Sequence, residues 1–477
     1  MSEQPQFTIK VDQNQYLPEG GREVHAIVSV EATAADAAGG AGGALPAAGP
    51  ATRASEVIII DTSGSMSYPE TKLHAAVEAA QVAVDTLRDG VEFAVVSGSN
   101  VASMVFPQQQ DLVPANDENR RLAKEALGRL RASGGTAIGS WLRQADVLFG
   151  DREGIRHAIL LTDGKNQHET PEQLDAVLFR CEGRFICDCR GVGTDWEVAE
   201  LRKVSSALLG SVDIVRDPAG LVADFQAMTE AAMGKSVADV ALRLQTPQTA
   251  RLKFVKQVLP TVEDLTGRRV EVPPQAGDYP LGAWGEESRD YHVCVELPPG
   301  EVGKVLRAVW VKLVVPGAPG EEAQVLATGN VLAEWTDDEA RSTRINDRVA
   351  HYTGQAELAV AIQEGLQARE RGDEDTATAR LGRAVVLADE AGNEEITSLL
   401  RKVVDVVDPA TGTVRLKKNV DKADEMSLDT RSTKTVRTRK DETVNNRAQR
   451  PAHEQSDDGR GQKADRDANV DRRGRKV

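Results

Sequence analysis

The sequence predicts an α/β protein whose main domain is a doubly wound, mostly parallel sheet, with an added antiparallel β-sandwich, a small helical hairpin and a disordered tail. Three observations support this fold class. Apolar runs alternate with amphipathic helices over residues 55–233, as in a parallel sheet covered on both faces. Short strands separated by Pro and Gly turns replace the helices over residues 235–336,. Helical periodicity then returns over residues 346–407,.

The N-terminal residues 1–34 are expected to contribute strands to the sandwich. QFTIKVDQNQYL and REVHAIVSVEA alternate apolar and polar positions around the turn-forming PEGG,. Two isolated strands are marginal in water, so we expect them to complete the later sheet. Residues 35–54 form an Ala/Gly/Pro tract without periodicity, which predicts a flexible linker,.

Within the main domain, the strand run VIII precedes a helix with one apolar stripe. That stripe comprises Leu73, Ala76, Val77, Ala80, Val84 and Leu87,. The runs EFAVVSG, ASMVF and HAILL predict further strands, and helices are expected near 117–130 and 138–149,. Two later helices have clear starts, because Thr170-Pro171 and Asp217-Pro218 each combine a capping side chain with a proline in the first turn,.

The C-terminal third has two predicted parts. Residues 346–407 have apolar positions at helical spacing and resemble one tetratricopeptide unit, but a solenoid usually needs at least three repeats, so we expect a helical hairpin or three-helix segment,. From residue 408 to residue 477 the sequence is polar and mixed in charge, which predicts a disordered tail,.

The charge and the cysteines limit the possible functions. The chain carries a formal net charge of -16, because residues 1–430 are acidic while the tail from Arg431 is net basic. An acidic body argues against nonspecific nucleic-acid binding, so no such binding is expected. No signal peptide and no run of about 18 apolar residues is found, so we expect a cytoplasmic protein without membrane insertion. The four cysteines make no disulfide framework, and Cys187 and Cys189 are interpreted as reduced core thiols rather than metal ligands,.

Three segments place oxygen ligands where strands of the parallel sheet end. They are DTSGS after the strand EVIII, SGGT before a helix, and TDG after HAILL. Ligands bind at the carboxyl ends of strands in such sheets. The candidate metal ligands are Asp61, Ser63, Ser65, Thr136 and Asp163.

Hydroxyls and carboxylates suit a hard cation, here Mg²⁺ or Mn²⁺. Because these groups do not all bind directly, a coordination position is left for water or for a carboxylate from another molecule. Each segment alone would also fit an ordinary turn, since Ser, Thr and Asp beside Gly are common turn residues. Three such segments at one sheet edge favour the metal site.

DTSGS, SGGT and LLTDG, in this order and strand context, resemble the metal-ion-dependent adhesion site of von Willebrand factor type A domains. The resemblance covers about residues 55–233. It implies that Ser63, Ser65 and Thr136 touch the metal, while Asp61 and Asp163 act largely through water. It also implies that an acidic side chain of a protein partner completes the coordination shell.

Enzymes are the main competing class. The order D-x-S differs from the D-x-D-x-T of haloacid dehalogenase phosphatases, since Ser63 stands where the second Asp would be. Lys235-Ser236 resembles the end of a P-loop, but Thr229 replaces its first glycine. His74, His157 and His168 have no evident triad partners in the sequence,. We therefore expect a non-enzymatic binding module, with a hydrolase such as a phosphatase as the less favoured alternative.

The wider layout resembles cytoplasmic A-domain proteins of actinobacterial type, which are often associated with Ser/Thr kinases and forkhead-associated domain proteins. An adaptor for an AAA+ ATPase, as in chelatase systems, is the alternative function. The segment from residue 429 to residue 438 mixes hydroxyls with basic residues, so we predict possible phosphorylation of Thr433, Thr435 and Thr438 in the tail. A solvated basic tail without modification fits the same segment equally well.

Overall fold

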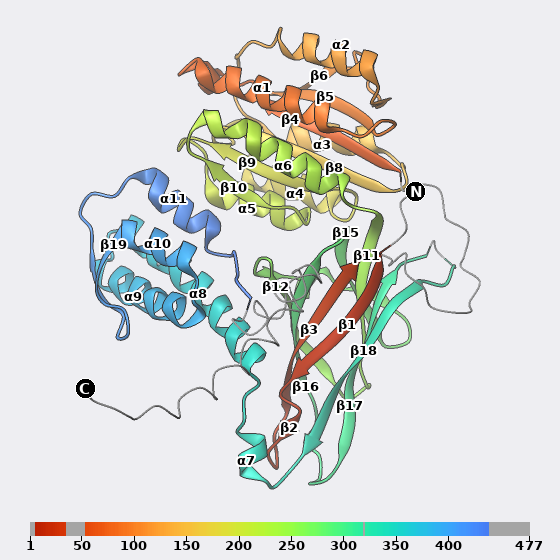
Figure 1. Cartoon of the computed structure of the whole chain (residues 1–477), viewed down its shortest axis with the longest axis vertical. Helices are drawn as coiled ribbons and strands as arrows, with labels where there is room; N and C mark the ends of the chain where they lie inside the picture. Colours follow the sequence, from red (N-terminus) through yellow and green to blue (C-terminus); the bar gives the residue numbers. More distant parts are fainter. Residues whose placement is uncertain (1–4, 35–52, 318–319, 438–477) are drawn as a thin grey trace, which may run out of the picture. The chain divides into compact units, whose positions relative to one another are not determined.

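Seven strands form the sheet of the α/β domain, in the order β10-β9-β8-β4-β5-β6, with β7 paired to β5 (Figure 1). In this computed structural model, residues 5–34, 53–317 and 320–437 are described. The strands are β4 (Ala54–Asp61), β5 (Glu92–Gly98), β6 (Ala102–Phe106), β7 (Val113–Pro114), β8 (Ile155–Thr162), β9 (Ile186–Val192) and β10 (Val212–Val215). Five strands are parallel, and β6 and β7 run antiparallel to β5. The predicted fold class is confirmed.

Six α-helices cover both faces of this sheet. They are α1 (Thr71–Thr86), α2 (Asp117–Leu127), α3 (Ile138–Phe149), α4 (Pro171–Cys181), α5 (Val198–Ala207) and α6 (Leu221–Met233). The core on one face includes α1, α2 and α6, and the core on the other includes α3, α4 and α5. The expected capping box is present at Thr170, and Asp217 caps a 3-10 turn, η2 (Pro218–Gly220), before α6. Strand β4 is buried at all eight positions because both layers pack on it.

Two antiparallel sheets make the β-sandwich. One has the order β1-β3-β16-β12-β13 and the other β14-β15-β11-β17-β18-β2. Their strands are β1 (Gln6–Gln13), β2 (Tyr16–Leu17), β3 (Glu23–Thr33), β11 (Val237–Gln245), β12 (Arg251–Leu259), β13 (Glu263–Asp264), β14 (Val270–Val272), β15 (Ala276–Trp284), β16 (Ser288–Glu296), β17 (Val305–Val315) and β18 (Gln324–Trp335). Alternate apolar positions of both sheets meet in one core,. The N-terminal strands thus pair within this sandwich, and β2 is its one parallel addition.

Strand β15 is absent from the strands that the sequence predicts. It contains Pro280 and Gly282, which are typical of turns,. The short β14 pairs only with residues 276–278 of β15. Beyond that point one side of β15 is an edge, so the missing N–H of Pro280 breaks no ladder there. Gly282 has a φ of +74° next to an irregularity in the pairing with β11.

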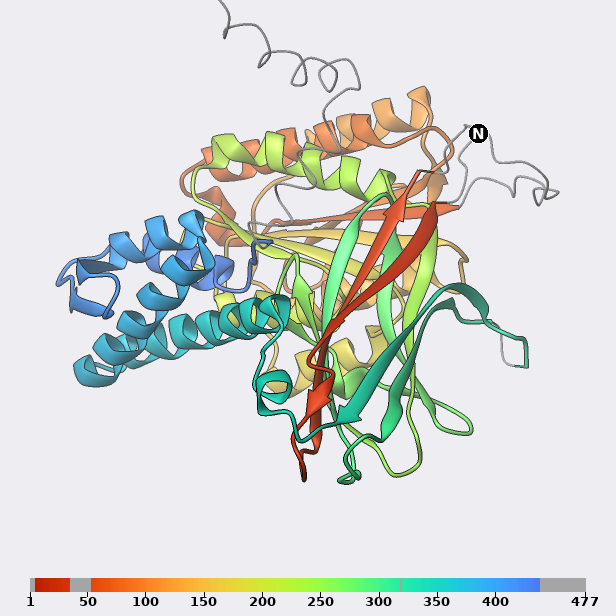
Figure 2. The same ribbon diagram turned by 60° about the horizontal axis from the view of Figure 1, so that its bottom comes forward.

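Helices follow the sandwich. They are α7 (Glu339–Ser342), α8 (Asp347–Glu370), α9 (Glu374–Ala391) and α10 (Glu394–Val403). The first turns of α8 lie on the five-stranded sheet, where Val349 and Tyr352 pack against Ile27 and Val258 (Figure 2). Among the described residues, no helix has both the length and the apolar character that crossing a bilayer would demand.

Order continues past Asp408, so the predicted start of the disordered tail is wrong. A hairpin of β19 (Val404–Asp408) and β20 (Thr413–Leu416) and a helix, α11 (Lys422–Arg431), follow α10. This polar segment can fold with few apolar residues. Val414 and Leu428 are buried in the helical core, and ion pairs hold α11 to the α/β domain. Arg202 and Arg216 bind Asp429 and Asp424 there. Residues 438–477 lie outside the described residues.

The segment predicted to be phosphorylated is also ordered up to Thr435. Lys434 pairs with Asp213 of β10 at 2.7 Å. The backbone N–H of Val262 donates to the carbonyl of Thr433, and the Thr435 hydroxyl donates to the carbonyls of Val258 and Pro260 at 2.7 and 3.1 Å. The predicted end of the linker, residue 54, is also corrected, because Ala54 is the first residue of β4. Residues 35–52 and Thr438 lie outside the described residues.

Candidate metal site

The first loop of the site begins where β4 ends. Both carboxylate oxygens of Asp61 accept hydrogen bonds: Oδ1 from the backbone N–H of Ser63 at 2.7 Å and Oδ2 from the Thr162 hydroxyl at 2.6 Å. The carboxylate is fully buried. The hydroxyls of Ser63 and Ser65 share a hydrogen bond of 2.9 Å, so both oxygens lie together above Asp61. Asp61 therefore shapes this loop rather than pointing into solvent.

The second loop is joined to the first by backbone hydrogen bonds. The N–H of Gly64 donates to the carbonyl of Gly134 at 2.9 Å, and that of Ser133 donates to the carbonyl of Thr62 at 2.6 Å. Gly134 has a φ of +83°, a conformation that favours glycine,. This turn brings Thr136, which is 4% exposed, to the same edge of the sheet.

The third segment adds a carboxylate and a cation. Asp163 follows β8 and is buried. Its Oδ1 accepts the Ser65 hydroxyl at 2.6 Å, and its Oδ2 accepts the ammonium of Lys72 at 2.7 Å. Lys72 comes from the first turn of α1, and its Nζ lies 3.6 Å from Asp195 as well. The structure thus adds a buried lysine that the sequence analysis did not single out.

The oxygens surround one small space beside Gly164. A Cβ atom added at this glycine would lie 3.1 Å from Thr136 Oγ1, 3.3 Å from Ser65 Oγ and 3.9 Å from Asp61 Oδ2. Any larger residue would fill the space between the ligands. Thr136 itself is buried beside this space. A hard divalent cation fits this arrangement of hydroxyl and carboxylate oxygens.

Burial makes the site electrostatically unfavourable without a cation. Burial raises the pKa of Asp61 to about 6, against the hydrogen bonds from Ser63 and Thr162, which lower it,. Asp163 contributes to the increase through repulsion between like charges. Lys72 compensates only one of the two carboxylates directly. The remaining negative charge would be stabilised by a bound cation.

All five predicted ligands lie at one sheet edge, at the ends of β4 and β8 and in the loop before α3. The sequence analysis assigns no role to two further contributors: Thr162, which lies in the TDG segment and orients Asp61, and Lys72. The need for a cation near Asp61 and Asp163 could have been predicted, because two neighbouring buried carboxylates require a counter-charge. The position of Lys72 at the start of a helix carries no motif by which to recognise it.

The rim of the site offers a surface for contact. Tyr68 is 85% exposed, directly after the 3-10 turn η1 (Gly64–Ser67), whose Met66 is fully buried. Lys165 is exposed and pairs with Glu197. Met66 therefore packs the loop, while Tyr68 is available to another molecule.

The three histidines considered as triad candidates lie in different environments. His157 does have partners, contrary to the sequence-based expectation: its Nδ1 lies 2.9 Å from Glu56 and its Nε2 3.0 Å from Asp188. Burial lowers its pKa, but the carboxylates of Glu56 and Asp188 outweigh this and raise the pKa to about 10. Both ring nitrogens are occupied by carboxylates, so the imidazolium is part of a buried ion cluster. His74 and His168 are exposed.

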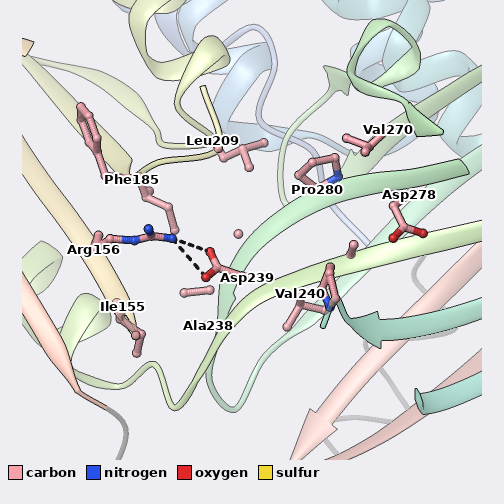
Figure 3. A pocket seen from close by; sticks show the side chains of 17 residues that line it. Ile155, Arg156, Phe185, Leu209, Ala238, Asp239, Val240, Val270, Asp278 and Pro280 are labelled. Carbon is pink, nitrogen blue, oxygen red and sulfur yellow. Dashed lines mark hydrogen bonds and ion pairs between the residues drawn. The ribbon is translucent and has the colours of Figure 1, made fainter. Parts of the chain in front are cut away.

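A cavity of about 340 Å³ lies at the opposite ends of the strands (Figure 3). It is lined mostly by apolar residues of β8, β9, β11 and β15, with the Arg156–Asp239 ion pair at 3.0 Å on one side. Ile155, which lines the cavity, is the first residue of β8, and the ligand Asp163 follows its last residue, Thr162. At the usual rise of a strand, the cavity lies roughly 20 Å from the metal site. It takes no part in the predicted metal chemistry.

Asp61→Asn should stabilise the metal-free protein at pH 8 while abolishing metal binding. The raised pKa of Asp61 means that the folded state favours the protonated acid, so this contribution to stability is present below about pH 4 and is lost as the pH rises through about 6,. A neutral amide avoids the buried charge and should add about 2 kcal/mol at pH 8, a gain that shrinks toward pH 4. Urea unfolding in EDTA measures it. A less stable variant at pH 8 would refute this account.

Lys72→Met should destabilise the metal-free protein by about 3 kcal/mol, because Asp163 is left buried without its cation,. The loss should be smaller in saturating Mg²⁺, since the ion then supplies positive charge beside Asp163. Lys165→Met is the matched control, since this lysine pairs at an exposed position and should change stability by less than about 1 kcal/mol,. Unfolding curves with and without Mg²⁺ test this, and an equal loss in both conditions would contradict it.

The chain matches two family descriptions. Residues 56–214 match the von Willebrand factor type A domain, and residues 386–432 match the von Willebrand factor type A C-terminal domain. The second match covers α10, the β19–β20 hairpin and α11. It therefore falls on the part of the chain where the sequence analysis placed the start of a disordered tail.

Similar proteins agree with these matches. A von Willebrand factor type A structure from Catenulispora acidiphila is 53% identical, with a TM-score of 0.85 over 92% of this chain and 98% of that one. The ArnB paralog VWA2 from Sulfolobus acidocaldarius shares the fold at 15% identity, with a TM-score of 0.52 over 90% of this chain and 98% of that chain. An uncharacterized protein of Synechocystis is 26% identical over 44% of this chain, which spans 49% of that protein's length. This chain belongs to the von Willebrand factor type A family.

Proposed function

We propose that this protein is an adaptor that binds another protein through a divalent cation. Domains of this family commonly mediate metal-dependent protein interactions and are generally not enzymes. Ser63, Ser65 and Thr136 would hold Mg²⁺ or Mn²⁺ directly, and Asp61 and Asp163 would act through water. The observation that carries the proposal is the small space beside Gly164, which three hydroxyl and carboxylate oxygens surround.

The charge of the site favours an acidic partner. Two carboxylates face the ion, and Lys72 neutralises one of them. With a divalent ion bound, one positive charge is left at the site, and it attracts a carboxylate. Tyr68 on the rim is the kind of aromatic side chain that dominates binding energy at protein interfaces,.

Calorimetry tests the metal ligands. The wild type should bind one Mg²⁺ or Mn²⁺ per chain, and the Asp61→Ala, Ser63→Ala double variant should lose binding at the wild-type affinity. Ser67→Ala is the matched control, because this hydroxyl lies in the same loop but donates to the carbonyl of Gly64. Unchanged binding by the double variant would remove the basis of the proposal.

Affinity capture tests the mechanism. Wild type in Mg²⁺ should retain a partner that is lost in EDTA and with Asp61→Ala, and substitution of one acidic residue on that partner should also abolish binding. Tyr68→Ala should weaken partner binding at least tenfold while metal affinity stays unchanged, since this side chain is 85% exposed and is not one of the five ligands,. If every partner stays bound in EDTA, the adhesion-type mechanism is wrong. An AAA+ ATPase as the metal-dependent partner would identify the motor-adaptor alternative.

We also propose that Ser/Thr kinases act on the segment containing Thr433, Thr435 and Thr438. The Thr435 hydroxyl donates to two carbonyls, so a phosphate there would face acceptor oxygens and should release the segment from β12,. The free phosphothreonine could then bind a forkhead-associated domain.

Mass spectrometry of protein from its native cell should find the phosphate. Thr435→Glu should speed amide exchange in α11 and the residues after it, whereas Thr435→Ser, which keeps the hydroxyl, should not. If no growth condition yields a phosphate between Thr430 and Thr438, the kinase link fails and the metal-dependent module stands alone.

A further inference from the structure

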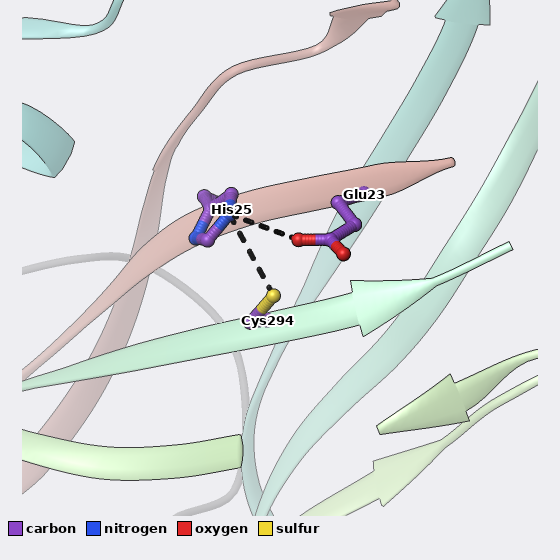
Figure 4. A group of neighbouring side chains, drawn as sticks. All are labelled: Glu23, His25 and Cys294. Atoms are coloured by element: carbon purple, nitrogen blue, oxygen red, sulfur yellow. Dashed lines mark hydrogen bonds and ion pairs between the residues drawn. The ribbon is translucent and has the colours of Figure 1, made fainter. Parts of the chain in front are cut away.

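A second group of metal-ligating side chains lies on the outer face of the five-stranded sheet of the sandwich (Figure 4). Glu23 and His25 are two residues apart on β3, so their side chains share a face,. Cys294 of β16 lies directly opposite His25 in the strand pairing. One ligand atom from each of the three lies within 4.8 Å of the others. None of these residues belongs to the adhesion-type site.

The distances fit a tetrahedral ion. Cys294 Sγ lies 3.7 Å from His25 Nε2, and that nitrogen lies 3.9 Å from Glu23 Oε2. Usual zinc bond lengths with tetrahedral angles place a sulfur and a nitrogen ligand about 3.6 Å apart and a nitrogen and an oxygen ligand about 3.4 Å apart. The third pair, Cys294 Sγ and a Glu23 carboxylate oxygen, lies within 4.8 Å, so side-chain rotation, chiefly of Glu23, would close the shell around an ion.

Neighbouring side chains orient two of the three ligands. His25 Nδ1 lies 3.1 Å from Nε2 of His292, so one of these two facing nitrogens must lack a proton. If His25 donates, its Nε2 has a free lone pair directed at Cys294 and Glu23. Lys253 donates to Glu23 Oε1 at 2.7 Å, which leaves Oε2 toward His25. Such second contacts are typical of ligands that hold a metal.

The cluster is buried on the side of Cys294 and exposed to solvent on the side of His25 and Glu23. Cys294 is buried, and the Phe254 ring packs edge-on against His292 with ring centroids 5.0 Å apart. The side chains of His25 and Glu23 are 32% and 44% exposed, which gives an ion a path from solvent. Both strands lie inside a sheet, so the ligands are placed by rigid backbone,.

We propose that Glu23, His25 and Cys294 form a binding site for a borderline transition-metal ion of the Zn²⁺ class, with one coordination position left for water. A thiolate and an imidazole select such an ion over Mg²⁺, which prefers oxygen ligands throughout. His292 is a positioning residue that acts through His25. A bound ion would connect the N-terminal strand β3 to β16 and so raise the stability of the sandwich.

Cobalt binding to the full chain tests the site, because Co²⁺ bound by a thiolate absorbs through charge transfer whereas an all-oxygen site does not. The Asp61→Ala, Ser63→Ala background removes the adhesion-type ligands and separates the two sites. One equivalent of Co²⁺ should give the thiolate band in wild type and in this background, and Zn²⁺ should displace it. Cys294→Ser should abolish the band. Cys187→Ser, at a buried thiol elsewhere, should keep it.

Two milder variants keep the test decisive if Cys294→Ser does not fold. Glu23→Gln, at an exposed side chain, should weaken Co²⁺ and Zn²⁺ binding at least tenfold. His292→Ala should keep the band but lower metal affinity about 10- to 100-fold. A wild-type protein without the band, a band that survives Cys294→Ser, or unchanged affinity in Glu23→Gln would overturn the proposal.

Discussion

Two carboxylates, Asp61 and Asp163, lie buried at one edge of a parallel sheet, and the site around them is arranged to compensate their charge. Asp61 accepts two hydrogen bonds and Asp163 accepts the Ser65 hydroxyl and the Lys72 ammonium. Even so, burial raises the pKa of Asp61 to about 6. A fold that keeps two acids so close without a full complement of cations is stabilised by binding one.

Local sequence patterns predict a strand or helix correctly where its structure depends little on contacts with distant parts of the chain. The apolar run VIII of β4 predicts a strand buried on both faces. The predicted stripe on α1 matches its packing face in part, since Ala76, Ala80 and Val84 are buried, but Leu73 and Val77 are only partly buried. Strand β15 escapes prediction because Pro280 and Gly282 are acceptable only at the edge that the short β14 leaves. The region after Asp408 escapes it for another reason. Its order depends on ion pairs between α11 and the α/β domain, which no local pattern contains.

In the metal site too, some features follow from local sequence patterns and others depend on tertiary contacts. Asp61, Ser63 and Ser65 share one loop, so the sequence shows their spacing directly. Asp163 follows the neighbouring strand β8, and Thr136 lies in the loop between α2 and α3, which hydrogen bonds join to the first loop. Lys72 is different, because a lysine in the first turn of a helix is usually solvated. Only the packing of α1 over the sheet carries its ammonium to Asp163. The ligands could therefore be predicted from the sequence, but their charge balance could not.

The order of elements along the chain explains why the metal edge stays accessible. The α/β domain is inserted between strands of the sandwich, since β1 to β3 precede it and β11 to β18 follow it. Its chain enters at the amino end of β4 and leaves at the end of α6, which runs back to the same edge of the sheet. Contacts between Arg156 of β8 and Asp239 of β11 occur at that edge too. Both connections and the Arg156–Asp239 contact thus use the amino ends of the strands, and Ser63, Ser65 and Thr136 converge at the opposite, carboxyl ends, where the proposed partner would bind.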